Sequence, residues 1–315
     1  MLYTDEDIKF NIMSMFGGIF YMAKNNPQSA DRFYKFTYKT LDIKFHRYIY
    51  GEGEYIEFIE TEIPDTGQRK DMVVIQDGKT IRITEFMATD LNSDKLDDIF
   101  DYHDSSRIDP VYHGLEVKTG VVSIADPNHG KKLVEIDDHI CFRVSPIFTK
   151  DKDGWKVLST ITYKVIGQEE LTDTEAIDLL ILPDMDINLP IKGLMKTIIF
   201  LIGHAIIPDK EFKTDIIYCE MRALARFFKD EELSEMIEML KLETKNPEIQ
   251  RVIEKYGKGF DVIYFDGKAD GILEGKLEAK REDAKKFLEN GVDEEIISKC
   301  TGISITEIRK LKRKP

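Results

Sequence analysis

The hydrophobic positions of the first 41 residues recur with helical spacing, which predicts two helices. Ile8, Ile12 and Phe16 lie on one stripe of a helix over 4–24, and a second helix is predicted over 29–41. The next part of the chain is rich in residues that favour strands. It predicts strands over 54–63, 71–76, 80–86, 120–124, 139–144 and 155–165, with one helix over 90–104.

From Thr172 onward the pattern becomes helical. Prolines separate four predicted helices, over 173–183, 190–206, 209–228 and 230–243. The tail combines a charged helix over 276–289 with two short helices, 293–300 and 304–312. We therefore predict an α/β domain over 1–168, a helical region over 169–265, and a charged helix with a terminal helical hairpin over 266–315.

The net charge of the chain limits how it could bind nucleic acid. The 315 residues include 45 Lys and Arg against 59 Asp and Glu, a net charge of −14. Such an acidic body does not attract nucleic acid through its overall field, so DNA contact requires a local basic face or a divalent metal. The most concentrated positive segment is Thr306–Pro315, with five basic residues and one acidic.

The composition also predicts a cytoplasmic protein. The longest apolar stretch, Leu194–Ile207, has 14 residues and contains Lys196 and His204. It is shorter than the roughly 20 residues of a membrane-spanning helix. The first residues are acidic and do not resemble a signal peptide. The three cysteines are far apart in the sequence, which favours a reducing compartment.

The most informative segment is the hairpin formed by 71–76 and 80–86. The apolar pattern requires that Val73 and Ile81 share one face. A three-residue loop, Gln76–Gly78 with Gly78 left-handed, satisfies this requirement and places Val73 opposite Ile81. A two-residue loop would instead pair Val73 with Arg82 and bury a charge.

In that register Asp71 and Glu85 are diagonal neighbours at the open end of the hairpin. Diagonal positions are roughly 7–8 Å apart at the backbone, so both carboxylates can approach one divalent cation. Mg²⁺ and Mn²⁺ prefer oxygen ligands together with water and substrate phosphate. The pair therefore predicts a metal site suited to phosphodiester hydrolysis.

The segment from Asp71 to Glu85-Phe86-Met87 resembles the core motif of the PD-(D/E)XK nuclease superfamily, and within it the recombination-promoting nuclease and transposase family. The tail segment 291–311 is similar to the end of those proteins, and Arg69 matches a basic residue frequent there. The resemblance covers roughly residues 30–125 and 265–315. It implies a restriction-endonuclease-like mixed sheet flanked by helices, a metal-dependent DNA endonuclease activity, and a metal site at Asp71 and Glu85.

The chain departs from the family at position 87, where Met stands in place of Lys or Gln. A thioether cannot donate a hydrogen bond to water or phosphate. Strand parity places Arg69 on the face of Glu85, so Arg69 is the expected catalytic substitute, whereas Lys70 and Arg82 are expected on the opposite face. The sequence does not decide whether Asp7 or Asp31, from an early helix, provides a third carboxylate.

Two other classes of function stay open. A relative without cleavage activity would act as a DNA- or protein-binding module, with Met87 as the sign of lost catalysis. A self-associating structural protein would form homo-oligomers through its C-terminal tail. His103 and His113 have no ligand spacing and are expected at the surface, and the chain contains no phosphate-binding glycine motif.

Overall fold

The computed structural model describes residues 27–59, 70–87, 93–108, 113–124, 133–135, 141–143, 146–244, 246–256, 284–288 and 297. Residues 1–257 form one compact unit, and residues 258–315 form a second. The arrangement described below is that of the first unit. The predicted helix over 4–24 and the predicted tail helices lie outside the described residues, apart from short helical pieces at 284–288 and 297.

A mixed sheet of five strands forms the α/β part of the described chain, in the order β1-β2-β3-β4-β7. The β1–β2 and β2–β3 pairs are antiparallel, whereas the β3–β4 and β4–β7 pairs are parallel. A separate antiparallel pair is formed by β5 and β6. The strands are β1 Ile56–Phe58, β2 Met72–Gln76, β3 Thr80–Met87, β4 Glu116–Ser123, β5 Leu133–Glu135, β6 Cys141–Arg143 and β7 Pro146–Phe148.

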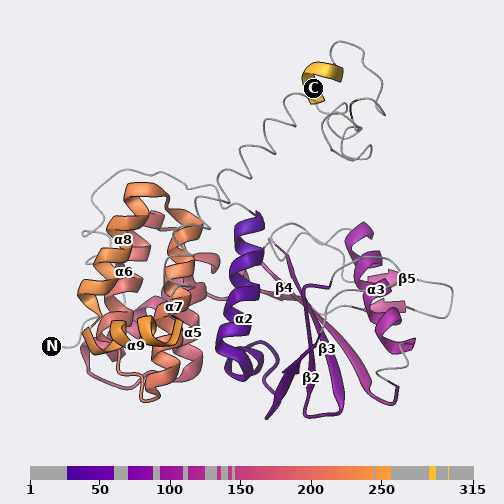
Figure 1. Ribbon diagram of the computed structural model, residues 1–315, viewed down its shortest axis with the longest axis horizontal. Helices are drawn as coiled ribbons and strands as arrows, with labels where there is room; N and C mark the ends of the chain where they lie inside the picture. Colours follow the sequence, from indigo (N-terminus) through magenta and orange to yellow (C-terminus); the bar gives the residue numbers. More distant parts are fainter. Residues whose placement is uncertain are drawn as a thin grey trace. The chain divides into compact units, whose positions relative to one another are not determined.

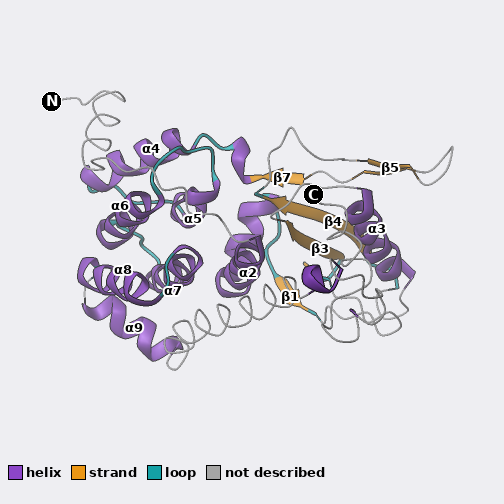
Figure 2. Cartoon of the chain, turned by 90° about the horizontal axis from the view of Figure 1, so that it is seen from above, coloured by secondary structure: helices purple, strands orange, loops and turns teal. Residues whose placement is uncertain are grey.

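Helices α2 (Pro27–Tyr50) and α3 (Ser93–Ile108) cover opposite faces of this sheet (Figures 1 and 2). On the α2 side, the ring of Tyr34 stacks on Phe86 of β3 with centroids 5.7 Å apart. On the α3 side, Met87 of β3 packs in a buried apolar cluster with Leu96 and Ile99. Alternating residues of β3 therefore face different helices, as the twofold period of a strand requires.

The hairpin is confirmed, but its predicted pairing was wrong by two residues. Val73 pairs with Ile83, and Gln76 pairs with Thr80, which leaves Asp77–Lys79 as the loop. The expected sharing of faces is retained, because a shift by two positions preserves strand parity. Both Asp77 (φ 52°) and Gly78 (φ 66°) have positive φ, so the turn uses two left-handed residues where the prediction required one.

The predicted strand over 155–165 was also wrong, because this segment is helix α4 (Gly154–Ile166). Its buried residues include Leu158, Ile161 and Val165, which lie on one helical stripe. The preceding segment supplies the helix cap, since the side chain of Asp153 accepts a hydrogen bond from the Lys156 amide. Of the β-branched residues that suggested a strand, Ile161 and Val165 are buried on this stripe, whereas Ile166, just beyond the predicted strand, is exposed.

The second half of the described chain is helical, as predicted. The remaining elements are η2 Thr149–Asp151, α5 Asp173–Ile181, η3 Leu182–Asp184, α6 Ile191–His204, α7 Lys210–Phe227, α8 Asp230–Glu243 and α9 Asn246–Tyr256. Helix α9 was not predicted. Within the described residues no helix is both long enough and apolar enough to cross a membrane.

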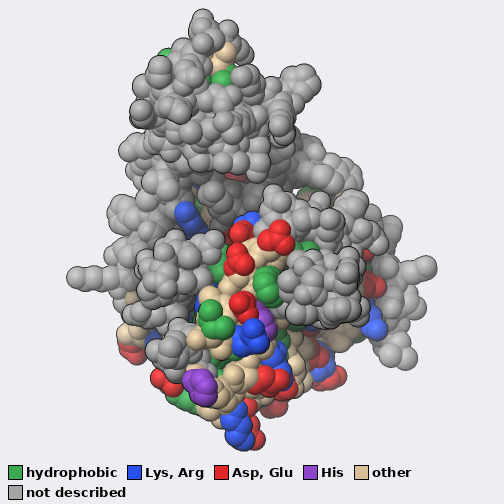
Figure 3. All heavy atoms as spheres, turned by 90° about the vertical axis from the view of Figure 1, so that its right-hand side faces the viewer, with side chains coloured by type: hydrophobic (Ala, Val, Ile, Leu, Met, Phe, Trp, Pro, Cys, Tyr) green, Lys and Arg blue, Asp and Glu red, His purple; other side chains and the backbone are tan. Residues whose placement is uncertain are grey.

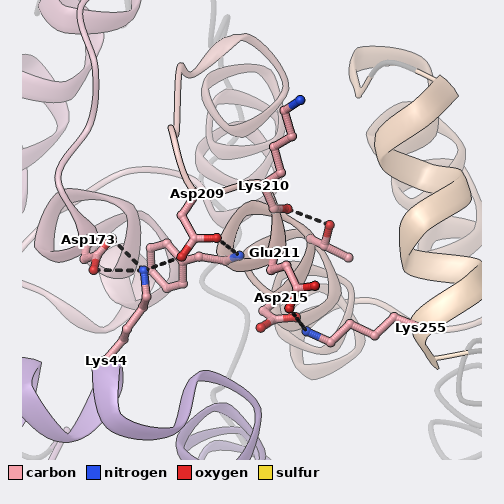
Figure 4. A network of polar contacts seen from close by, with 9 residues as sticks. Lys44, Asp173, Asp209, Lys210, Glu211, Asp215 and Lys255 are labelled. Carbon is pink, nitrogen blue, oxygen red and sulfur yellow. Dashed lines mark hydrogen bonds and ion pairs between the residues drawn. The ribbon is translucent and has the colours of Figure 1, made fainter. Parts of the chain in front are cut away.

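Helix α2 joins the sheet to the helical half, because it packs against both β3 and α7. At its C-terminal half the ammonium of Lys44 pairs with Asp173, the first residue of α5, and with Asp209, the N-cap of α7 (Figure 4). The predicted end of this helix at residue 41 coincides with a kink, since Asp42 has non-helical dihedrals (φ 50°, ψ −126°). The chain then resumes a helix up to Tyr50, which the sequence analysis missed.

Candidate functional site

The predicted carboxylates meet at the open end of the β2–β3 hairpin. The observed register, extended by one pair, puts Asp71 directly opposite Glu85 rather than diagonal to it. Glu85 Oε1 accepts a hydrogen bond from the Asp71 amide (2.9 Å), and Asp71 Oδ2 accepts one from the Phe86 amide (2.9 Å). Each carboxylate is thus held by the backbone of the facing strand, which fixes their relative position.

Helix α2 adds an ammonium and a third carboxylate to this pair. Lys35 Nζ lies 2.5 Å from Asp71 Oδ1 and 2.9 Å from Asp31 Oδ2. Asp31 and Lys35 are four residues apart, so they lie on one face of the helix. Of the two early carboxylates that the sequence left open, Asp31 is in this cluster, whereas Asp7 lies outside the described residues.

Burial makes the cluster electrostatically unusual. Burial, together with the negative charge of Asp71, raises the pKa of Glu85 to about 8 and also raises the pKa of Asp31. Burial by itself would lower the pKa of Lys35, but its bonds to Asp71 and Asp31 outweigh this effect and the pKa is raised. The cluster therefore holds three acidic groups, two of which contact the Lys35 ammonium, an excess of carboxylate of the kind found at functional sites.

Helix α3 forms the wall of the cluster on the Glu85 side. Burial and the nearby charge of Glu85 raise the pKa of the Tyr102 hydroxyl to about 12. Lys95 is close enough to lower the pKa of Glu85 slightly against the effect of burial. Figure 3 views the molecule from the side of α3, and in the described part of that face acidic and basic side chains are interspersed.

The prediction for Lys70 was wrong, while that for Arg82 is confirmed. Lys70 donates to Ser106 Oγ of α3 (2.5 Å), on the side of the sheet that Glu85 faces, because the backbone bends at Asp71 before the strand begins. Arg82 lies on the α2 side, where its guanidinium is 4.2 Å from the centroid of the Tyr50 ring. Strand parity is reliable only inside the strand.

Neither Arg69, the expected catalytic substitute, nor Met87, the departure from the motif, contributes a polar group to the described part of the site. Arg69 lies outside the described residues, and the observed register gives Glu85 a different partner, Asp71. Met87 is buried in the apolar cluster under α3 and does not supply a polar group. His103, expected at the surface, is half-buried, with Nδ1 3.1 Å from Thr119 Oγ1, and His113 is exposed.

The donor set fits a hard divalent cation, because carboxylate oxygens are its preferred protein ligands. The Asp31 Oδ1 atom is buried without a hydrogen-bond partner among the described residues. In the arrangement observed, no group of three or more His, Cys, Asp or Glu side chains among the described residues is placed to hold a metal ion. Lys35 instead contacts two of the three carboxylates.

Comparison with family models, with curated proteins and with solved structures gives no match for this chain. The candidate site therefore depends on its geometry and on the resemblance of the motif. Lys35 was missed by the sequence analysis, although a signal was present. The signal is an Asp and a Lys four residues apart on a predicted helix, a spacing that places both side chains on one face.

Proposed function

We propose that this protein is a metal-dependent DNA endonuclease with a restriction-endonuclease-like fold, related to recombination-promoting nucleases and transposases. The observation that carries the proposal is the reciprocal bonding of Asp71 and Glu85 at the end of a sheet covered by α2 and α3. Two carboxylates held this rigidly, with Asp31 beside them, are suited to bind Mg²⁺ or Mn²⁺.

In this proposal Asp71 and Glu85 would hold the cation, which when bound would act as a Lewis acid and activate the water that hydrolyses the phosphodiester. Glu85 would hold the cation in its ionised form, because a positive charge favours the ionised carboxylate. The backbone amides of Asp71 and Phe86 keep both carboxylates oriented throughout. Lys35 provides an ammonium beside these carboxylates, in contact with Asp71 and Asp31.

The proposed partner is DNA, and the charge balance limits how it is bound. With a net charge of −14, the protein requires local contacts rather than a general field to hold a polyanion. The metal site and the basic segment Thr306–Pro315 are the proposed contacts. We also propose that the protein forms homo-oligomers through its C-terminal tail.

The experiment is plasmid nicking by the purified protein in Mg²⁺ or Mn²⁺, with Asp71→Asn and Glu85→Gln as test variants. Loss of a metal ligand typically reduces the rate by about 100-fold or more. Glu116→Gln is a matched control, because Glu116 is an exposed carboxylate at the opposite end of β4. Circular dichroism of every variant establishes that the fold is retained.

The alternative is a DNA- or protein-binding module without cleavage, and one observation favours it. Met87 contributes to the core under α3, so the strand itself supplies no polar side chain at that position. Folded wild-type protein that leaves the plasmid intact in both metals, or cleavage that survives both substitutions, would reject the endonuclease and leave the binding module.

A further inference from the structure

We infer that Lys35 is a positioning residue that exchanges partners when a divalent cation binds, holding Asp71 in the absence of the cation and pairing with Asp31 alone in its presence. This inference rests on the proposed metal site at Asp71 and Glu85. It assigns a role to a side chain on helix α2 that lies outside the strand motif.

The first step is the occupancy of the Asp71 carboxylate. Oδ2 accepts the Phe86 amide at 2.9 Å, and Oδ1 lies 2.5 Å from Lys35 Nζ. Moving Oδ2 would break a backbone contact between the strands, whereas Oδ1 is held by a flexible side chain. A cation bound by Asp71 therefore takes Oδ1, the oxygen that Lys35 occupies.

The second step is the repulsion between two cations. Metal–oxygen distances are about 2.1 Å for Mg²⁺, so an ion on Oδ1 would lie within roughly 4 Å of the ammonium in its present position. Like charges at this separation repel strongly in a partly buried site. Lys35 and the cation cannot both stay on the same oxygen, so the ammonium must move.

The third step is the destination of the ammonium. Lys35 already contacts Asp31 Oδ2 at 2.9 Å, and Asp31 Oδ1 is buried without a hydrogen-bond partner. A small rotation of the lysine stem would give the ammonium both oxygens of Asp31 and satisfy the unpaired atom. The exchange leaves a neutral Asp31–Lys35 pair beside a cation held by Asp71 and Glu85.

The test is calorimetric titration of Mn²⁺ into the full-length protein at one pH, comparing wild type with Lys35→Met, Asp31→Asn and the double variant. Removing the competing ammonium should tighten Mn²⁺ binding by about tenfold, the size of one partly buried ion pair. Asp31→Asn removes the alternative partner of Lys35, so it should weaken binding by about threefold or more. In the Lys35→Met background that weakening should largely disappear.

The control is Lys39→Met, which removes the same charge from an exposed position one turn further along α2 and should leave Mn²⁺ affinity unchanged. Unchanged affinity in Lys35→Met would overturn the inference. Equal weakening by Asp31→Asn in both backgrounds would also overturn it, because Asp31 would then be a direct ligand. Wild-type protein that binds no Mn²⁺ rejects the proposed metal site itself, whereas binding that requires Asp71 and Glu85 but ignores Lys35 rejects the exchange alone.

Discussion

Helix α2 contacts two clusters of carboxylates and cations, which differ in how completely their carboxylate oxygens are bonded. In the first, the buried Asp184 carboxylate receives two hydrogen bonds from Arg226 (2.8 and 2.9 Å) and one from the Tyr34 hydroxyl (3.0 Å). The side chains of Arg226 and Asp184 are 2% and 0% exposed. In the second, one ammonium serves two carboxylates, and Glu85 lies beside them.

The difference separates a structural cluster from a candidate site. In the Asp184 cluster both oxygens of the carboxylate are bonded by Arg226 and Tyr34, so the pair joins η3, α7 and α2. The carboxyl of Glu220 is also buried near Arg226, and burial raises its pKa, which favours the uncharged acid beside this pair. The Lys35 cluster has more acid than base, and the pKa of Glu85 is raised to about 8. An excess of buried carboxylate destabilises a fold unless a proton or a cation neutralises it.

The largest expected effect on stability comes from breaking the buried pair of Asp184 and Arg226. Arg226→Ala would leave the Asp184 carboxylate buried and uncompensated, which typically costs about 3–5 kcal/mol of unfolding free energy. Urea unfolding followed by circular dichroism measures the change. A loss below about 1 kcal/mol would mean that this pair does not join the helical half to α2. Lys192→Met, which removes an exposed pair with Glu232, is the matched control and should cost less than about 1 kcal/mol.

The second effect is a dependence of the unfolding free energy on pH, caused by Glu85 in the Lys35 cluster. Glu85 holds its proton more tightly in the folded protein (pKa about 8) than at its ordinary value of 4.5. Its contribution to stability is therefore complete below about pH 4.5 and is lost as the pH rises through about 8. Glu85→Gln should remove this slope in metal-free buffer, gaining about 2–4 kcal/mol over wild type at pH 9.

Unfolding curves of wild type and Glu85→Gln between pH 5 and 9 provide the measurement. Parallel stability curves for the two proteins would contradict a raised pKa at Glu85. Added Mn²⁺ should restore wild-type stability at high pH while leaving the Gln variant nearly unaffected, because the cation replaces the proton as the compensating charge.

A smaller effect is expected at Met87. Met87→Leu conserves the volume of a buried side chain in the cluster with Leu96 and Ile99, so it should cost less than about 1.5 kcal/mol. It should also leave the rate of plasmid cleavage unchanged, since the residue lines the core. A large loss of cleavage with retained stability would instead assign Met87 a role at the carboxylates.

The smallest effect is expected at the exposed network of Figure 4. Lys44 pairs with Asp173 and Asp209, whose side chains are 52% and 46% exposed. Solvent screening limits each such pair, so Lys44→Met should cost about 0.5–1 kcal/mol, part of it from lost contact with the Phe212 ring. Thermal unfolding at low and high salt measures this loss of stability. A loss as large as that of Arg226→Ala would contradict the expected difference between buried and exposed ion pairs.

Much of the secondary structure and part of the site could be predicted from the sequence. Helices such as α6 and α7 were found from their apolar spacing and proline boundaries, and Asp71 and Glu85 were found from the hairpin pattern. The failures occurred where one pattern suits two structures. The 154–166 segment is rich in β-branched residues but has helical spacing of Leu158, Ile161 and Val165, and its burial selects the helix.

The sequence alone determined the alternation of faces in β2 and β3, because parity depends only on counting residues along a strand. It therefore brought Asp71 and Glu85 to the same end of the hairpin even with the wrong loop. Only the tertiary structure decided what surrounds them. Lys35 and Asp31 come from a helix 36 to 54 residues away in the chain, and their contacts depend on how α2 packs across the sheet, which no local pattern specifies.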